Sequence, residues 1–183
     1  AGQWPAWAPR SDDRVAHIFE PGFDAWPETS QTVAVVGGGI SAGQVALRLL
    51  AEGHQVHLIS RHPPREHQFD SDPGWLGPKH MAGFSRVKDP DKRRAMISAA
   101  RHKGSMPPDV LRALRRAIRR KRLDWHEGEV VGCASDSPGL GLQIRPTHAD
   151  TAGIDVERIQ VDRVLLAGAT GAEAPRGDAE GQR

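Results

Sequence analysis

The chain has 183 residues, of which 38% are hydrophobic and 26% charged, a composition expected for one globular domain of ordinary size. No apolar stretch approaches the roughly 20 residues that span a bilayer, and the first residues show no secretory signal. The single cysteine, Cys133, excludes an internal disulfide and any metal site built on paired cysteines. We therefore expect a cytoplasmic protein with no membrane partner.

Residues 1–31 form an N-terminal arm rich in proline and aromatic residues. The prolines disfavour regular structure, so none is expected there. Such apolar side chains are too costly to leave in water, so we expect the arm to pack on another surface. The aromatic residues of the arm are Trp4, Trp7, Phe19, Phe23 and Trp26.

Residues 32–59 carry the pattern of a strand, a glycine turn, a helix and a second strand. Both residues 32–36 and residues 56–59 are short runs with β-branched and apolar residues. Gly53 stands where the intervening helix would end. One face of that helix is apolar, through Ala42, Val45, Ala46, Leu49 and Leu50. This order predicts a strand–helix–strand unit of an α/β fold.

The turn in this unit reads Gly-Gly-Gly-Ile-Ser-Ala-Gly over residues 37–43, a dinucleotide-binding fingerprint of the form GxGxxA. Gly37 permits a tight turn, Gly39 lets the backbone approach a pyrophosphate, and Ala42 or Gly43 keeps the helix close to the sheet. The N-terminus of the helix then offers free N–H groups to the phosphates. A glycine-rich turn without a ligand is the alternative. The candidate pyrophosphate-binding residues are Gly37, Gly38, Gly39, Ile40, Ser41 and Ala42.

The end of the second strand bears on which dinucleotide binds. NAD-binding domains usually place a carboxylate about 20 residues after the glycines, for the adenine ribose hydroxyls. Here that position reads Ser60-Arg61, with no carboxylate along the chain until Glu66. An arginine can form paired hydrogen bonds with a 2′-phosphate, so Ser60 and Arg61 predict NADPH rather than NADH. In the alternative, Arg61 is merely solvated.

The rest of the chain alternates irregular and regular segments. Residues 61–109 are rich in proline, and only residues 90–102 within them are expected to be helical. Strands are expected over residues 129–134, 140–145, 157–161 and 163–167, as a small antiparallel meander followed by a return strand. The four histidines at 54, 57, 62 and 67 are interpreted as surface residues, and we expect no metal site.

A basic helix is predicted over residues 108–122, with Leu111, Leu114 and Ile118 facing inward. Residues 110–123 carry seven basic side chains and no acid; since the total net charge is +2, the remainder carries −5. A localised stripe of this kind argues against a general nucleic-acid binder. Binding of an acidic partner or of nucleic acid stays open beside the simpler interpretation of a solvated helix face.

The glycine motif and Ser60-Arg61 together resemble the NADPH-binding domain of class B flavin monooxygenases, in particular the lysine and ornithine N-hydroxylases. Val15-Ala16-His17 lies about 20 residues before the glycines, where that branch commonly carries Val-x-His. Ala169-Thr170-Gly171 matches the end of its last strand, although Gly168 intervenes here. The resemblance covers residues 13–171 and implies that Ala169, Thr170 and Gly171 belong to the cofactor site.

The same resemblance implies a second cofactor, FAD, which accepts hydride from NADPH and activates oxygen. No glycine motif before Gly37 can serve FAD, so we expect the FAD site to lie outside this chain. The expected function is the NADPH-binding part of a flavin-dependent monooxygenase-type oxidoreductase. The N-terminal arm would then meet a separate flavin domain or a second copy of the chain. A non-catalytic NAD(P)-binding sensor is the alternative.

The predicted organisation is therefore an aromatic arm over residues 1–31, a dinucleotide-binding domain over 32–171 and a polar tail over 172–183. The middle part is expected to be a Rossmann-like α/β domain with a small antiparallel β-meander insertion.

Overall fold

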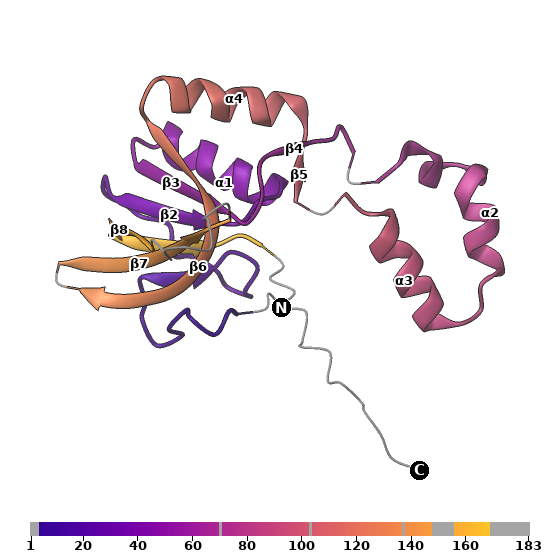
Figure 1. Cartoon of the computed structure of the whole chain (residues 1–183), viewed down its shortest axis with the longest axis horizontal. Coiled ribbons are helices and arrows are strands. Elements are labelled where there is room, and N and C mark those ends of the chain that lie inside the picture. The colour runs from indigo at the N-terminus through magenta and orange to yellow at the C-terminus, as the bar shows by residue number, and fades with distance from the viewer. Residues whose placement is uncertain (1–3, 70, 103, 137, 148–155, 169–183) are drawn as a thin grey trace, which may run out of the picture.

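A seven-stranded sheet organises the chain, with strand order β1-β9-β2-β3-β6-β7-β8 (Figure 1). The computed structural model describes residues 4–69, 71–102, 104–136, 138–147 and 156–168. The strands of this sheet are β1 (Val15–His17), β2 (Thr32–Val36), β3 (Gln55–Ser60), β6 (Leu123–Asp136), β7 (Gly139–Pro146), β8 (Glu157–Val161) and β9 (Arg163–Leu166). A separate pair consists of β4 (Arg65–Glu66) and β5 (Ser105–Met106).

The predicted strand–helix–strand unit is confirmed as β2, α1 (Ile40–Ala51) and β3. The two strands pair in parallel, Val33 opposite Val56 and Val35 opposite Leu58. Their helix-facing residues form one core with α1 and α4 (Pro108–Arg119). Ala34 and Ile59 point to the other face, into a second core. Burial on both faces explains why these strands are nearly continuous in apolar residues.

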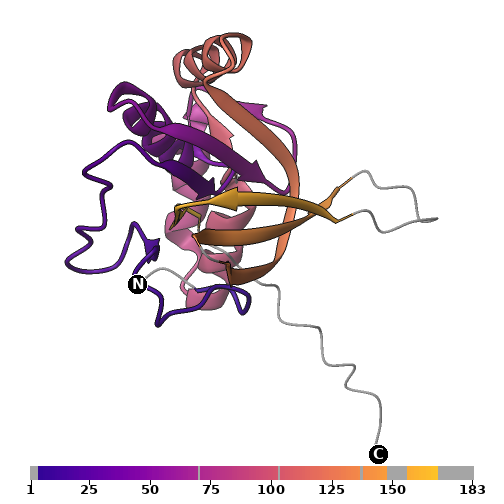
Figure 2. The same cartoon turned by 90° about the vertical axis from the view of Figure 1, so that its left-hand side faces the viewer.

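β6 continues the sheet beyond β3, and its second half curls over the second face of the sheet. Its first residues, from Leu123 to Glu127, pair in parallel with β3, whereas the rest pairs antiparallel with β7. The strand then curls with β7 and β8 into the predicted antiparallel meander, which Figure 2 shows from the side. Leu140, Leu142 and Ile144 of β7 pack there in the second core. The parallel half of β6 was not part of the predicted strand, which began at residue 129.

The N-terminal arm belongs to the same folded unit. The expectation that it lacks regular structure is wrong at β1, which pairs in parallel with β9 at the edge of the sheet. Trp4 and Trp7 pack against the meander-side core, and Phe23 and Trp26 against the helix-side core. Of the arm's aromatic residues, Phe19 stays exposed, at 49%. The surface on which the aromatic residues of the arm mostly pack is therefore this chain's own core.

Arg14 and Asp12 form an ion pair within the arm, and both residues hydrogen-bond to the meander. Arg14 donates from Nε and Nη2 to the Asp12 carboxylate at 2.9 and 2.7 Å, and from Nη1 to the Gly139 carbonyl at 3.2 Å. The Ser135 hydroxyl also donates to Asp12, at 3.0 Å. These donors hold the pKa of Asp12 well below its usual range. The arm thus contacts the meander through a carboxylate whose pKa is lowered by the hydrogen bonds that it accepts.

Replacing Asp12 with asparagine is expected to lower the free energy of unfolding at pH 7. Because the folded-state pKa is lowered, the carboxylate stabilises the fold above about pH 4, and this stabilisation is lost as the pH falls further. The difference between wild type and Asp12→Asn in urea unfolding should therefore shrink below about pH 4. Asp13→Asn, which removes an exposed neighbouring carboxylate, is the matched control variant.

A helical segment projects from the body between β4 and β5 (Figure 1). It contains a short 3₁₀ helix, η1 (Pro73–Leu76), then α2 (Pro78–Arg86) and α3 (Pro90–Ala100). The helix expected over 90–102 is confirmed, but the interpretation of the preceding residues as irregular is wrong. Pro78 occupies the first turn of α2, where a missing N–H costs nothing. Phe84 is buried against Trp75, and Arg93 lies over its ring at 4.4 Å.

The basic helix is confirmed as α4, with Leu111 and Leu114 fully buried and its arginines outward. It ends in a Schellman turn, in which the Arg122 N–H donates to the Ala117 carbonyl at 3.1 Å. Lys121 takes the left-handed position of that turn, at φ 53°. A glycine is usual there, because a side chain in this conformation is strained.

Replacing Lys121 with glycine is accordingly expected to raise the free energy of unfolding by about 1 kcal/mol. Urea denaturation measures this change. Lys121→Ala removes the same charge but keeps a side chain, so it should give no comparable gain. Equal gains in both variants would assign the effect to charge rather than to backbone strain.

None of the helices in the described ranges is long and apolar enough to cross a membrane.

Candidate functional site

The predicted cofactor residues gather at the carboxyl edge of the parallel strands. The Gly37 N–H donates to the Ile59 carbonyl at 2.9 Å, and the Ala167 N–H donates to the Val36 carbonyl at 2.9 Å. The ends of β2, β3 and β9 are therefore joined where the chain leaves the sheet. This edge is the usual place for a ligand in an open α/β fold.

The three glycines of the turn have different surroundings. A Cβ on Gly37 would lie 3.0 Å from Ala42 Cβ and 3.1 Å from the Ala167 backbone, so a side chain does not fit there. A Cβ on Gly38 would come 3.0 Å from the His62 ring. At Gly39 the nearest atom would be Gly104 Cα at 3.8 Å, so this glycine has free space in front of it. Gly39 is thus the position where a ligand could meet bare backbone.

The N-terminus of α1 lies directly after this free space. Gly39 is its N-cap residue and makes no side-chain capping bond. The first N–H groups of a helix have no partner within the helix, so they remain available to an anion. Ser41 is half-buried, whereas the Ile40 side chain is 40% exposed beside the turn.

Ala42 and Gly43 have different surroundings, although the same role was predicted for either of them. Ala42 is fully buried and lies against the Gly37 turn, on the sheet side of the helix. A Cβ on Gly43 would come 2.8 Å from Val110 Cγ1 and 3.0 Å from Met106 Sδ. Gly43 therefore allows α4 and β5, rather than the sheet, to approach α1.

Ser60 and Arg61 lie at the end of β3, as predicted. Ser60 is buried, and its hydroxyl donates to the His62 carbonyl and accepts from Trp125 Nε1, both at 2.9 Å. Arg61 is exposed, and its backbone carbonyl accepts from the Thr147 hydroxyl at 2.9 Å. Within the described ranges no ion pair involves its guanidinium. Arg61 is therefore free to meet an anion, whereas the Ser60 hydroxyl is already occupied.

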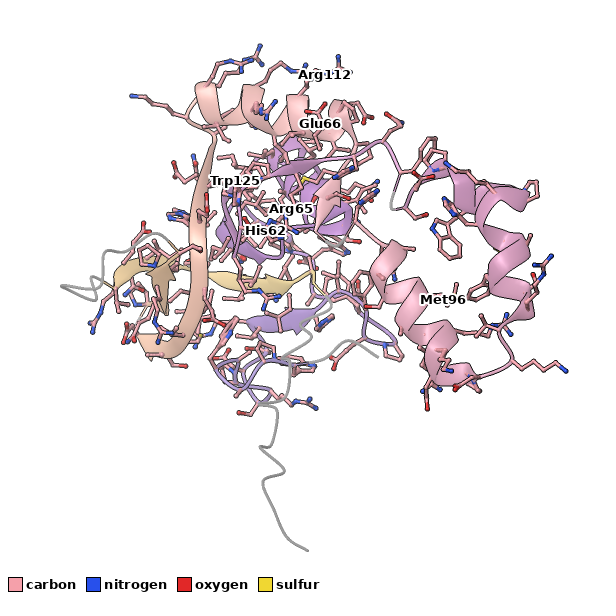
Figure 3. The ribbon with its side chains drawn as sticks, turned by 45° about the vertical axis from the view of Figure 1, so that its right-hand side comes forward. His62, Arg65, Glu66, Met96, Arg112 and Trp125 are labelled. Carbon is pink, nitrogen blue, oxygen red and sulfur yellow. The ribbon has the colours of Figure 1, made fainter. Side chains whose placement is uncertain are left out.

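Sequence reasoning missed His62 as part of this site. Its Nδ1 hydrogen-bonds with the Pro63 carbonyl at 2.8 Å, and its ring fills the space in front of Gly38 and Gly104. A Cβ on Gly104 would overlap the ring at 2.3 Å. His62 follows Arg61 directly in the chain, which was the available signal. Figure 3 shows it below α4 with Trp125, Arg65 and Glu66.

Glu127 is the second residue that the sequence did not indicate. β3 and β6 pair in parallel with Ser60 opposite Glu127, so this half-buried carboxylate lies one strand away from Ser60. Glu66, the first acid along the chain after β3, instead approaches Arg115 at 3.8 Å. The end of β3 therefore has a carboxylate neighbour in space, although none follows it closely in sequence.

His17 ends β1 at the same edge and is almost fully buried, at 1% exposed. Burial lowers its pKa, partly countered by the Gly168 backbone, so its imidazole is neutral at pH 7. Gly168 in turn lies close to Gly37. The predicted residues Ala169, Thr170 and Gly171 follow Gly168 but lie outside the described residues, as does the predicted tail over 172–183.

The histidines are not all surface residues, contrary to our interpretation. His54 is buried and accepts from the Gln31 N–H at 3.2 Å. His57 Nδ1 lies 2.9 Å from His126 Nε2, and the other nitrogen of His126 lies 2.9 Å from Glu157. Burial and the neighbouring His126 lower the pKa of His57. No group of three or more potential metal ligands occurs among the described residues.

No protein-family model matches this sequence, and no curated protein matches it. Solved structures do match in fold. The ornithine N-hydroxylase of Kutzneria sp. 744, with reduced FAD, NADP⁺ and L-ornithine, is 19% identical with a TM-score of 0.65 over 91% of this chain and 42% of that one. The L-lysine 6-monooxygenase of Pseudomonas syringae is 20% identical with a TM-score of 0.57 over 76% and 35%.

A structure of another class also matches: the bacillithiol disulfide reductase of Bacillus cereus, 17% identical with a TM-score of 0.54 over 91% of this chain and 36% of that one. The chain spans about two fifths of the length of the ornithine hydroxylases. The predicted resemblance to part of the ornithine and lysine N-hydroxylases is therefore confirmed in fold, as is the Rossmann-like α/β class. A domain of this fold serves more than one kind of oxidoreductase.

Proposed function

We propose that the chain is the NADP(H)-binding domain of a flavin-dependent monooxygenase-type oxidoreductase. The observation that carries this proposal is the free space at Gly39, which opens onto the uncapped N-terminus of α1. Bare backbone and free N–H groups at that place suit a pyrophosphate. The similar folds of the ornithine and lysine N-hydroxylases support the same assignment.

The residues present fit a dinucleotide. The backbone of Gly38, Gly39, Ile40 and Ser41 would hold the pyrophosphate, with Gly37 and Ala42 shaping the turn. Arg61 would bind the 2′-phosphate of NADPH, because it is exposed and unpaired among the described residues. Ser60 would reach that phosphate only by exchanging one of its internal hydrogen bonds. By resemblance alone, we assign Ala169, Thr170 and Gly171 to the closing turn of the site.

Bound NADPH would supply a hydride. The proposal requires a flavin, held by a separate domain, to accept it. The contribution of this chain would be to bind and orient the nicotinamide dinucleotide. The buried, neutral His17 and the Gly168 backbone would form part of the wall of the site.

Glu127 favours a second candidate, binding of NADH. A carboxylate beside Ser60 could accept hydrogen bonds from the 2′- and 3′-hydroxyls of the adenine ribose, and it would repel a 2′-phosphate. Arg61 would therefore favour NADPH, whereas Glu127 would favour NADH. We favour NADPH because Arg61 is the more exposed of the two.

Calorimetric titration of the full chain with NADPH, NADH and FAD tests the proposal. We expect NADPH to bind, NADH to bind more weakly and FAD to give no heat of binding. Tighter binding of NADH would support the second candidate. Heat from neither dinucleotide would contradict both.

A further inference from the structure

One strongly charged surface is not used by the proposed nucleotide site. We call it the basic face of α4, made of Arg112, Arg115, Arg116, Arg119, Arg120 and Lys121. All six side chains are exposed, and Arg112 lies on the outer side of α4 (Figure 3). In the described ranges, the ion pair of this face is the 3.8 Å contact of Arg115 with Glu66.

Within the described ranges the other five cations of the basic face form no ion pair, so they repel one another. Like charges one helical turn apart on a helix repel each other, and salt screens this repulsion only in part. Several such pairs recur along α4. A partner that brings carboxylates to this face therefore gains from relieved repulsion as well as from direct attraction.

A groove of about 210 Å³, lined by both apolar residues and arginines, lies beside the basic face, between α1 and α4. Its floor includes Leu47 and Leu50 of α1 and Ala113 and Ala117 of α4. The arginines 116 and 120 line it from α4. Alanine on the α4 side leaves room that larger side chains would fill. The groove therefore combines an apolar floor with a positively charged rim.

The Schellman turn after α4 closes one end of this groove. The turn at Lys121 directs Arg122 back toward α1, where its guanidinium donates to the Leu50 carbonyl. Arg122 also lines the groove, so it links the C-terminal ends of both helices. The groove thus lies at the end of α1 away from Gly39, about 16 Å along the helix from the proposed nucleotide site.

We propose that this groove binds an acidic amphipathic helix of a partner protein. Leucine-sized side chains on one face of that helix would enter the floor between Leu50 and Ala117. Its glutamates, one helical turn apart, would meet the arginines of α4, which have the same spacing. A nucleic-acid backbone would use the charges but not the apolar floor, and the basic face carries no aromatic residue for base stacking.

Fluorescence anisotropy with synthetic probes tests this proposal on the full chain. The first probe is an 18-residue helical peptide with leucine on one face and glutamate on the other; the second has the same composition in scrambled order. A third probe is a 20-nucleotide DNA duplex. We expect the amphipathic peptide to bind at least about tenfold more tightly than either alternative.

The double variant Arg116→Ser/Arg120→Ser should lose at least about tenfold of that affinity. Both side chains are exposed, so the fold should survive, which circular dichroism checks. The control variant Arg158→Ser removes an exposed arginine of β8 and should bind like wild type. Equal affinity for the ordered and scrambled peptides would mean that charge alone determines binding, and it would overturn the proposal. Tighter binding of DNA, or no binding of any probe, would also overturn it.

Discussion

Replacing Arg61 with alanine is expected to weaken NADPH binding about ten- to 150-fold and to leave NADH binding almost unchanged. A charge-assisted hydrogen bond contributes about 1.5–3 kcal/mol, and only NADPH carries the 2′-phosphate that would accept it. Arg61 is exposed and forms no ion pair within the described ranges, so its removal breaks no internal contact that would unfold the protein. Calorimetric titration with both nucleotides measures the two affinities.

Two further variants give this experiment its controls. Arg158→Ala removes an exposed arginine of β8 and should leave both affinities unchanged. Glu127→Gln should strengthen NADPH binding relative to NADH, because it removes the negative charge opposite Ser60. If Arg61→Ala lowered the affinities for NADPH and NADH equally, Arg61 would not bind the 2′-phosphate. Another group would then determine which nucleotide is preferred.

The strand–helix–strand unit could be predicted because its signals are local. The β-branched run of β2, the helical spacing of Ala42 to Leu50 and the stop at Gly53 each depend on neighbours a few residues away. The glycine at 53 adopts a φ of 92°, as a helix end requires.

Two of the missed strand segments, β1 and the parallel half of β6, depend on distant partners. β1 is a three-residue strand whose pairing comes entirely from β9, at the far end of the described chain. The parallel half of β6 contains Asp124, His126 and Glu127, whose polarity hid a strand that pairs with β3. Sequence propensity is a weak guide where tertiary pairing decides the structure.

The two missed site residues, His62 and Glu127, also owe their positions to contacts with residues distant in sequence. His62 belongs to the site because Gly38 and Gly104, far apart in sequence, together leave space for its ring. Glu127 belongs to it because of a cross-strand register. The fingerprint residues could be predicted because a phosphate-binding turn requires glycine at fixed positions along the chain. No such local requirement applies to His62 or Glu127.

Replacing Gly39 with alanine is expected to abolish most nucleotide binding without destabilising the fold. A methyl group there meets nothing nearer than Gly104 Cα at 3.8 Å, and the φ of −102° suits any residue. The same methyl group would stand where a pyrophosphate must approach the backbone. Affinities for NADPH and NADH should therefore fall together, by at least about tenfold, while the urea midpoint stays at the wild-type value.

Gly37→Ala is the matched comparison, because the same methyl group there meets Ala42 and the Ala167 backbone at 3.0–3.1 Å. This variant should lose about 1–3 kcal/mol of unfolding free energy through overpacking. The two variants therefore separate a glycine that the fold requires from one that the ligand requires. Unchanged nucleotide affinity in Gly39→Ala would mean that the free space at Gly39 is not where the pyrophosphate lies, and the proposed site would have to be abandoned.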